Sequence, residues 1–219
     1  MTILSDTRSA YDTVALNYAQ QFRDEMDHKP YDREMLMRLA ERVNGLGVIC
    51  DLGCGPGQIA RYLARQGVAV CGVDLSAEMV RQASLLNPTI PFQQGNMLAL
   101  DRVTDNSWGG VAAFYSIIHI PRHDVVNALR EIKRALKPGG TLLAAFHIGD
   151  EVKHIDEWWG KPVSVDFTFF QPVEMEDYMQ AAGYEQIEIN VRSPYPEIEF
   201  QSRRAYIFAV KPQATPSPN

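Results

Sequence analysis

The chain has 219 residues, a formal net charge of −6 and 46% hydrophobic residues. This length suits one compact domain with a small appendage, and the acidic charge argues against a nucleic-acid partner. No run of about 18 apolar residues predicts a membrane span, and the polar residues 1–10 hold no apolar signal core. We therefore expect a cytoplasmic protein without a membrane partner, either a monomer or a homodimer.

The cysteines are Cys50, Cys54 and Cys71. An odd number in a chain without an export signal argues against a disulfide framework. No histidine lies near them in sequence to complete a zinc site, so we predict no metal site and small buried thiols instead.

The first 44 residues predict two helices. Apolar residues from Tyr11 to Phe22 recur at helical spacing within 7–25, and Pro30 opens a second helix over 31–43. From residue 48 onward, short apolar runs alternate with helical segments. The expected strands are 48–51, 68–74, 90–94, 108–116, 141–147, 186–191 and 203–210, and the expected helices are 58–66, 76–86, 121–136 and 173–182. This alternation predicts a doubly wound α/β fold with a mostly parallel sheet.

Two segments fall outside this alternation. Residues 150–171 are rich in aromatic side chains, and we expect either a cap over a substrate or an insertion packed against the sheet. Residues 212–219 are rich in proline and serine, so we expect a disordered tail.

The most informative stretch follows the first expected strand and has glycine at every second position after an acid: Asp51, Gly53, Gly55 and Gly57. Glycines permit a tight turn and a close ligand, and the helix that follows directs its free N–H groups at that ligand. A dinucleotide-binding fingerprint would need a third glycine at position 58, which is Gln58. Asp74 ends the next strand and can accept hydrogen bonds from both hydroxyls of a ribose.

A third polar feature, around Asn96, follows the third expected strand. Its side-chain amide could pair with the edge of an adenine. All three features lie at the carboxyl ends of parallel strands, where open α/β sheets bind ligands.

Together with GVDLSAEMV (72–80) and LKPGGTLLAAF (136–146), these features make residues 45–148 resemble the class I S-adenosylmethionine-dependent methyltransferases. The resemblance implies a seven-stranded sheet with an antiparallel last strand. It also implies an N-terminal helical lid over 1–44, a methyltransferase domain over 45–211, and S-adenosylmethionine as cofactor. Two positions depart from the family pattern: Asn96, where aspartate is more common, and Gly110, where an acid commonly precedes strand four.

The resemblance also implies site residues. Those implied along the cofactor are Asp51, Gly53, Cys54, Gly55 and Gly57 at the glycine turn, Asp74 at the ribose, and Leu75, Met79, Asn96 and Met97 around the adenine. Those implied around the methyl donor are Phe114 and Tyr115 after strand four, and Tyr11 and Tyr18 on the lid.

Methyl transfer from a sulfonium is an in-line displacement that mainly requires alignment, although a base helps a hydroxyl or a protonated amine. His119 and His147 end strands four and five, and we expect both to face the crevice as candidate bases. A histidine at a strand end can equally be a hydrogen-bonded core residue.

The chain lacks the motifs of DNA-amine, cysteine-based RNA and metal-assisted catechol methylation. The acceptor is therefore expected to be an O or N atom of a small molecule. Two alternatives stay open: a nicotinamide-dependent oxidoreductase, and a protein that binds S-adenosylmethionine without catalysis.

Overall fold

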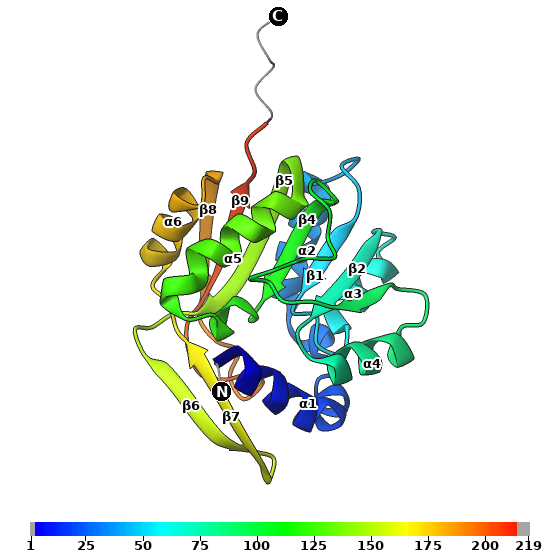
Figure 1. The fold of residues 1–219 in the computed structure, drawn as a ribbon, viewed down its shortest axis with the longest axis vertical. Coiled ribbons are helices and arrows are strands. Elements are labelled where there is room, and N and C mark those ends of the chain that lie inside the picture. Colours follow the sequence, from blue (N-terminus) through cyan, green and yellow to red (C-terminus); the bar gives the residue numbers. More distant parts are fainter. Residues whose placement is uncertain (1–2, 214–219) are drawn as a thin grey trace, which may run out of the picture.

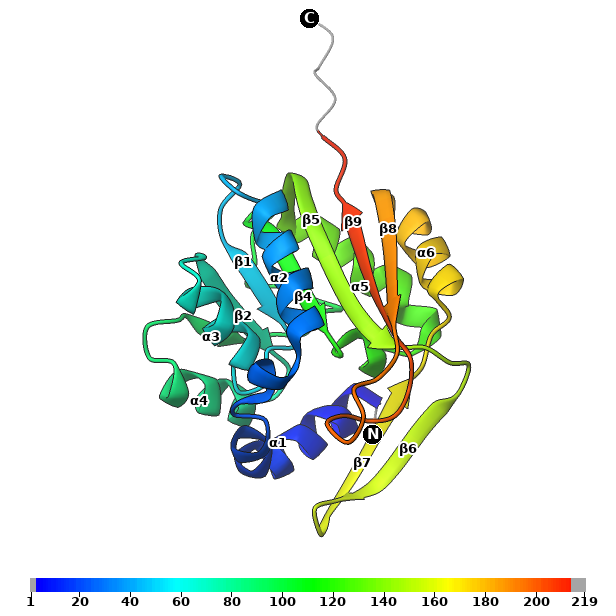
Figure 2. The same ribbon diagram turned by 180° about the vertical axis from the view of Figure 1, so that it is seen from behind.

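The computed structural model describes residues 3–213. Its central sheet has seven strands in the order β3-β2-β1-β4-β5-β9-β8 (Figures 1 and 2). They are β1 (Ile49–Leu52), β2 (Val70–Asp74), β3 (Phe92–Gln94), β4 (Trp108–Phe114), β5 (Leu136–His147), β8 (Glu185–Arg192) and β9 (Arg204–Val210). Strands β1 to β5 pair in parallel, whereas β9 runs antiparallel to both β5 and β8. The expected doubly wound sheet with an antiparallel last strand is confirmed.

Helices cover both faces of this sheet. They are α1 (Ile3–Gln21), α2 (Pro30–Arg42), α3 (Gln58–Arg65), α4 (Ala77–Leu86), α5 (Arg122–Ala135) and α6 (Pro172–Ala181), with short 3-10 turns η1 (Glu25–His28) and η2 (Ile117–His119). Helices α5 and α6 pack on one face, and α2 and α3 pack on the other. No described helix is long and apolar enough to cross a membrane.

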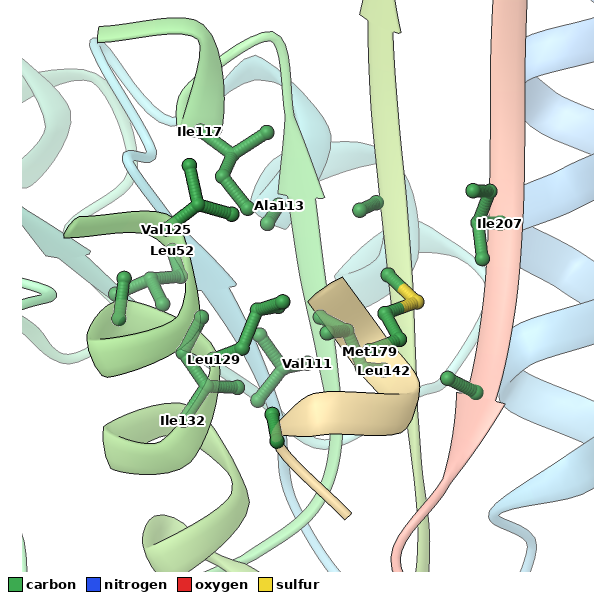
Figure 3. Packing of buried hydrophobic residues seen from close by; sticks show 14 of the residues in the cluster. Leu52, Val111, Ala113, Ile117, Val125, Leu129, Ile132, Leu142, Met179 and Ile207 are labelled. Carbon is green, nitrogen blue, oxygen red and sulfur yellow. The ribbon is translucent and has the colours of Figure 1, made fainter. Parts of the chain in front are cut away.

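The two cores follow from the alternation of side chains along the strands. In β4, Val111 and Ala113 contact α5 and its neighbours (Figure 3), whereas Ala112 and Phe114 belong to the core beneath α2. On α5, Val125, Leu129 and Ile132 are fully buried at helical spacing, as Figure 3 shows. Each such side chain contributes about 1.5–3 kcal/mol by leaving water, so these stripes fix the helices on the sheet.

The aromatic segment after β5 forms a two-stranded hairpin that the sequence did not predict. Strands β6 (Val152–Trp158) and β7 (Lys161–Thr168) pair antiparallel. They are joined at Trp159 and Gly160, which both have positive φ, as the common two-residue hairpin turn requires. The side chains of β6 are mostly exposed, so its sequence carries no alternation to reveal a strand.

Helix α1 and strand β7 lie side by side across the end of the sheet where the parallel strands terminate (Figures 1 and 2). The hairpin and the helix therefore cover the edge at which the sequence predicts a ligand. The tail predicted to be disordered begins at residue 212, and its residues 214–219 lie outside the described part of the chain.

Candidate active site

A cavity lies between α1 and the carboxyl ends of β1, β2, β3 and β4. It brings together most of the residues predicted from the sequence: Tyr11, Tyr18, Gly53, Cys54, Gly55, Asp74, Leu75, Asn96, Met97, Phe114, Tyr115 and His119. These residues come from segments more than 100 positions apart, so the fold alone assembles them.

The glycine-rich loop after β1 is pressed against the loop after β4. Gly53 has a φ of +77°, and a Cβ at this position would overlap the Cβ of Ser116. The hydroxyl of Ser116 donates to the carbonyl of Leu52 over 2.7 Å. The backbone N–H groups of Gly53 and Cys54 both donate to the carbonyl of Val73, at 2.7 and 3.1 Å. The loop is thus held close to the sheet, and this leaves room for a ligand above it.

Asp74 stands at the end of β2 with its carboxylate held in place by the backbone. Its two oxygens accept from the N–H groups of Gly55 at 2.7 Å and Ser76 at 2.8 Å. Burial, together with the nearby carboxylate of Asp12, raises the pKa of Asp74 to about 6 although these hydrogen bonds lower it. Each carboxylate oxygen keeps a second lone pair, so a pair of ribose hydroxyls can still donate to it.

Three predicted cofactor residues do not line the cavity. Asp51 is 1% exposed and accepts a hydrogen bond from the N–H of Ala60 over 3.0 Å, and burial raises its pKa to about 7. It therefore holds the turn between β1 and α3. Gly57 is the N-cap of α3, and Met79 in α4 is 0% exposed. These residues support the loop and the helices from behind.

Helix α1 is fastened over the cavity by its own polar side chains. Asp12 accepts hydrogen bonds from the hydroxyl of Ser76 at 2.5 Å and from the N–H of Glu78 at 3.2 Å. These contacts tie α1 to the N-terminus of α4. They direct Tyr11 and Tyr18 into the cavity wall, where the resemblance places them.

Tyr11 and His119 form a hydrogen-bonded pair. The hydroxyl of Tyr11 lies 2.8 Å from Nε2 of His119, and Nδ1 of His119 lies 2.9 Å from the backbone carbonyl of Asp166 in β7. A carbonyl can only accept, so Nδ1 carries the proton and Nε2 accepts from Tyr11. Burial lowers the pKa of His119 to about 4, so the imidazole is neutral near pH 7.

His147 does not line the cavity, which corrects the expectation that both histidines face the crevice. Its ring stacks on Phe169 at 5.0 Å, and its Nδ1 lies 2.7 Å from the hydroxyl of Ser202. Burial lowers the pKa of His147 to about 3, and the positive charges of Arg204 and Lys29 lower it further. The ring of His147 also lies 5.2 Å from that of Tyr115, so it packs behind a residue of the cavity wall.

Sequence reasoning missed several lining residues: Thr7, Glu25, Met26, Lys29, Asp32, Gln58, Ile59 and Ser116. Glu25 to Asp32 span η1 and the first turn of α2, where no motif marks a site. In the sequence, Gln58 indicates only that the dinucleotide-binding fingerprint is incomplete. Its place directly after the glycine motif was the one signal that could have identified it.

Charged residues at the α2 end of the cavity are paired with one another. Asp32 accepts from the hydroxyl of Tyr206 at 2.8 Å and from Arg192 at 3.0 Å. Arg192 also binds Glu199 at 2.5 Å, and Glu199 lies 3.7 Å from the ammonium of Lys29. Tyr206, Arg192 and Glu199 are remote in sequence from α2, so this network joins α2 to β8, β9 and the loop between them.

Tyr115 forms the cavity wall next to this network. It adopts a positive φ of +52°, and its hydroxyl lies 3.1 Å from that of Tyr206. The ammonium of Lys29 lies 5.4 Å from the centre of its ring. With Phe114 before it, Tyr115 gives this end of the cavity an aromatic surface.

Comparison with known proteins agrees with this geometry. A family model described as a methyltransferase domain matches residues 49–140. The malonyl-acyl-carrier-protein O-methyltransferase of Erwinia billingiae is 33% identical over 129 residues, which are 58% of this chain and 49% of that protein. The putative methyltransferase YqeM of Bacillus subtilis is 29% identical over 142 residues, 63% of this chain and 57% of YqeM. The chain spans about half the length of the curated relatives it matches.

Among solved structures, the DhpI–SAH complex has a TM-score of 0.71 and 20% identity, and the match covers 97% of this chain and 98% of that one. The phosphoethanolamine N-methyltransferase 2 of Haemonchus contortus has a TM-score of 0.70 and 18% identity, covering 97% of this chain and 61% of that one. These likenesses show the fold. The matched methyltransferase domain, residues 49–140, holds the glycine-rich loop, Asp74 and Asn96, so this part of the chain is similar in sequence to a methyltransferase domain.

Proposed function

We propose that this protein transfers the methyl group of S-adenosylmethionine to an O or N atom of a small molecule. The observation that carries the proposal is one cavity that holds a glycine-rich loop, the fixed carboxylate of Asp74 and the Tyr11–His119 pair. The first two suit a nucleoside with an amino-acid tail, and the pair suits an acceptor that must lose a proton.

The residues present fit this cofactor. Gly53 is packed so closely against Ser116 that a Cβ there would overlap its side chain, so glycine is what lets the loop approach the sheet beneath the cofactor. Asp74 would hold the ribose, Leu75, Asn96 and Met97 would contact the adenine, and the loop would lie under the methionine part. When bound, S-adenosylmethionine supplies an activated methyl group on a sulfonium.

The chain's own residues would align the acceptor and receive its proton. Because Tyr11 donates to His119, the lone pairs of the Tyr11 oxygen are available to an acceptor O–H or N–H. As the methyl group is transferred, the acceptor proton can pass to Tyr11 while the proton of Tyr11 passes to Nε2 of His119. The low pKa makes His119 a weak base. Alignment of the acceptor with the methyl group therefore contributes more to the rate enhancement than proton removal does.

Helix α1 and the β6–β7 hairpin would act together as a lid. They cover the strand ends, and the hairpin also supplies the Asp166 carbonyl that orients His119. Residues 1–44 would therefore belong to the catalytic unit. Because the hairpin packs on α1 and supplies the Asp166 carbonyl that holds His119, a cap over the substrate is the expectation for residues 150–171 that we carry into this proposal.

The test is transfer of isotope-labelled methyl from S-adenosylmethionine into a small-molecule extract, with and without the protein. A newly labelled product of low mass supports the proposal and identifies the acceptor. Binding of S-adenosylmethionine without any labelled product favours the non-catalytic alternative. Micromolar binding of NADH with no binding of S-adenosylmethionine would contradict the proposal and favour the nicotinamide-dependent oxidoreductase.

A further inference from the structure

Two polar atoms on the cavity wall are buried without a hydrogen-bond partner among residues 3–213: Oγ1 of Thr7 and Oε1 of Gln58. Thr7 is 4% exposed and Gln58 is 9% exposed. Such atoms are costly to bury unpaired, so each is a candidate contact for a bound molecule. The third unpaired atom in this part of the chain, Nε of Arg204, lies 3.2 Å from a carboxylate oxygen of Glu199 and so forms an ion pair.

The amide of Gln58 has a fixed orientation. Its Nε2 donates to a carboxylate oxygen of Glu25 over 3.1 Å, and a carboxylate can only accept, so the oxygen of the amide must point the other way. That oxygen lies 3.9 Å from where a Cβ on Gly55 would stand. The glycine loop is thus faced by a hydrogen-bond acceptor next to a carboxylate, which favours a cationic donor.

Thr7 stands at the opposite end of the cavity. It lies in the first turns of α1, and its neighbours Ser5 and Arg8 line a groove together with Gln94 and Asn96 beyond β3. Thr7 and Tyr11 are four residues apart, so they share one face of α1, and both line the cavity. That face runs along the cavity from the β3 end toward the glycine loop.

We propose, resting on the proposed function, that Gln58 and Thr7 recognise the two ends of the cofactor. The carbonyl of Gln58 accepts a hydrogen bond from the α-ammonium of the methionine part. The hydroxyl of Thr7 bonds the nitrogen-rich edge of the adenine. Helix α1 therefore contacts the adenine end of the cofactor and α3 contacts the methionine end, with the ribose contact of Asp74 between them.

The experiment measures Kd by calorimetry for two probes that share the adenosine part. S-adenosylhomocysteine has the α-amino acid, whereas 5′-methylthioadenosine lacks it. Gln58→Leu is expected to weaken S-adenosylhomocysteine about tenfold and to leave 5′-methylthioadenosine within about twofold. Thr7→Val is expected to weaken both probes by a similar factor of about five, and Thr7→Ser is expected to restore them.

Matched controls carry the same chemical change at exposed positions of the same helices. Gln66→Leu, directly after α3, and Thr13→Val in α1 are expected to leave both Kd values unchanged. Thermal unfolding of each variant identifies any that do not fold, and Gln58→Met then replaces Gln58→Leu.

The outcomes separate the two proposals. If the unaltered protein binds S-adenosylhomocysteine and Gln58→Leu weakens both probes equally or neither, the recognition of the ammonium is overturned. If Thr7→Val binds both probes normally, the adenine contact is overturned. If the unaltered protein binds neither probe, the proposed function fails together with this inference.

Discussion

The two ends of the cavity satisfy their polar groups in opposite ways. At the cofactor end, which extends from the glycine loop to the end of β3, Asp74 is held by backbone N–H groups, and Thr7 and Gln58 keep unpaired atoms. At the α2 end, Lys29 and Asp32 are already bound to other side chains. The first end therefore has hydrogen-bonding capacity to offer a ligand. The second uses its charges to hold segments of the chain together, and we expect it to select an acceptor by shape and by contact with aromatic rings.

The sharpest way to break this comparison is to remove a charge from the α2 end. Arg192→Ala leaves Asp32 and Glu199 buried with too few partners, so we expect a loss of about 3–5 kcal/mol in the free energy of unfolding. Urea unfolding measures it. Arg81→Ala, which breaks an exposed pair with Glu78, is the control and should cost less than about 1 kcal/mol. Equal effects would show that the network does not hold the fold.

At the cofactor end, Asp74→Ala should weaken cofactor binding and leave the free energy of unfolding nearly unchanged. We expect cofactor affinity to fall by about 1.5–3 kcal/mol, the range for hydrogen bonds to a charged group. Calorimetry with S-adenosylmethionine measures it, and Asp101→Ala on the surface is the control. An unchanged affinity would refute the ribose role of Asp74.

The two buried histidines offer a matched pair. His119 contacts Tyr11 at the cavity, whereas His147 contacts Ser202 behind it. We expect His119→Ala to lower kcat about 100-fold, at the low end for acid–base catalysis, with cofactor affinity nearly intact. His147→Ala should leave kcat within a few-fold. Labelled methyl transfer to the identified acceptor measures both, and the reverse ranking would move the catalytic role to β5.

The pH dependence of cofactor binding tests the state of Asp74. Binding favours the ionised carboxylate, and burial raises its pKa to about 6, so affinity should be lost as the pH falls through 6. Between pH 7 and pH 5 we expect about a tenfold loss, one pKa unit of protonation. The pKa values of His119 and His147, at about 4 and 3, lie below this window, whereas that of the buried Asp51, at about 7, lies within it. Asp74→Asn should bind weakly with little pH dependence, and a persistent slope would assign the effect elsewhere.

The smallest effect is expected at Tyr115. Its hydroxyl lies within hydrogen-bond distance of Tyr206, and the ring lines the cavity. Tyr115→Phe keeps the ring, so we expect the KM for the acceptor to change less than about threefold, a loss below about 0.7 kcal/mol. Steady-state kinetics measure it. A larger change would mean that the acceptor is bound through this hydroxyl and that the contrast between the two ends is weaker.

Much of the fold could be predicted because its signals are local. Strands β1, β2, β4 and β5 are apolar runs, and Ser76 is the N-cap of α4, as expected, with its side chain accepting from the N–H of Met79. The cofactor end of the site is likewise encoded in short motifs after strands. This is why the predicted residues there line one cavity.

The rest depends on contacts between segments far apart in the chain. Nothing near Asp32 indicates that Arg192 and Tyr206 will bind it, because those partners reach it only through the sheet order. The β6–β7 hairpin escaped prediction because its strands are largely solvated. The orientation of the His147 side chain depends on where the hairpin and Ser202 lie. Its position at the end of a strand therefore does not predict whether it faces the cavity.

The strand order has a consequence for how the protein is made. Strand β9 follows β8 in the chain, yet it lies inside the sheet between β5 and β8, and it carries Tyr206 to the ion network. Until residues 204–210 leave the ribosome, β5 presents an unpaired apolar edge and Asp32 lacks the hydroxyl of Tyr206. The nascent chain can form the glycine-loop half early, but the α2 half of the cavity can close only after translation has passed β9. Slow translation between β8 and β9 would therefore prolong an aggregation-prone intermediate.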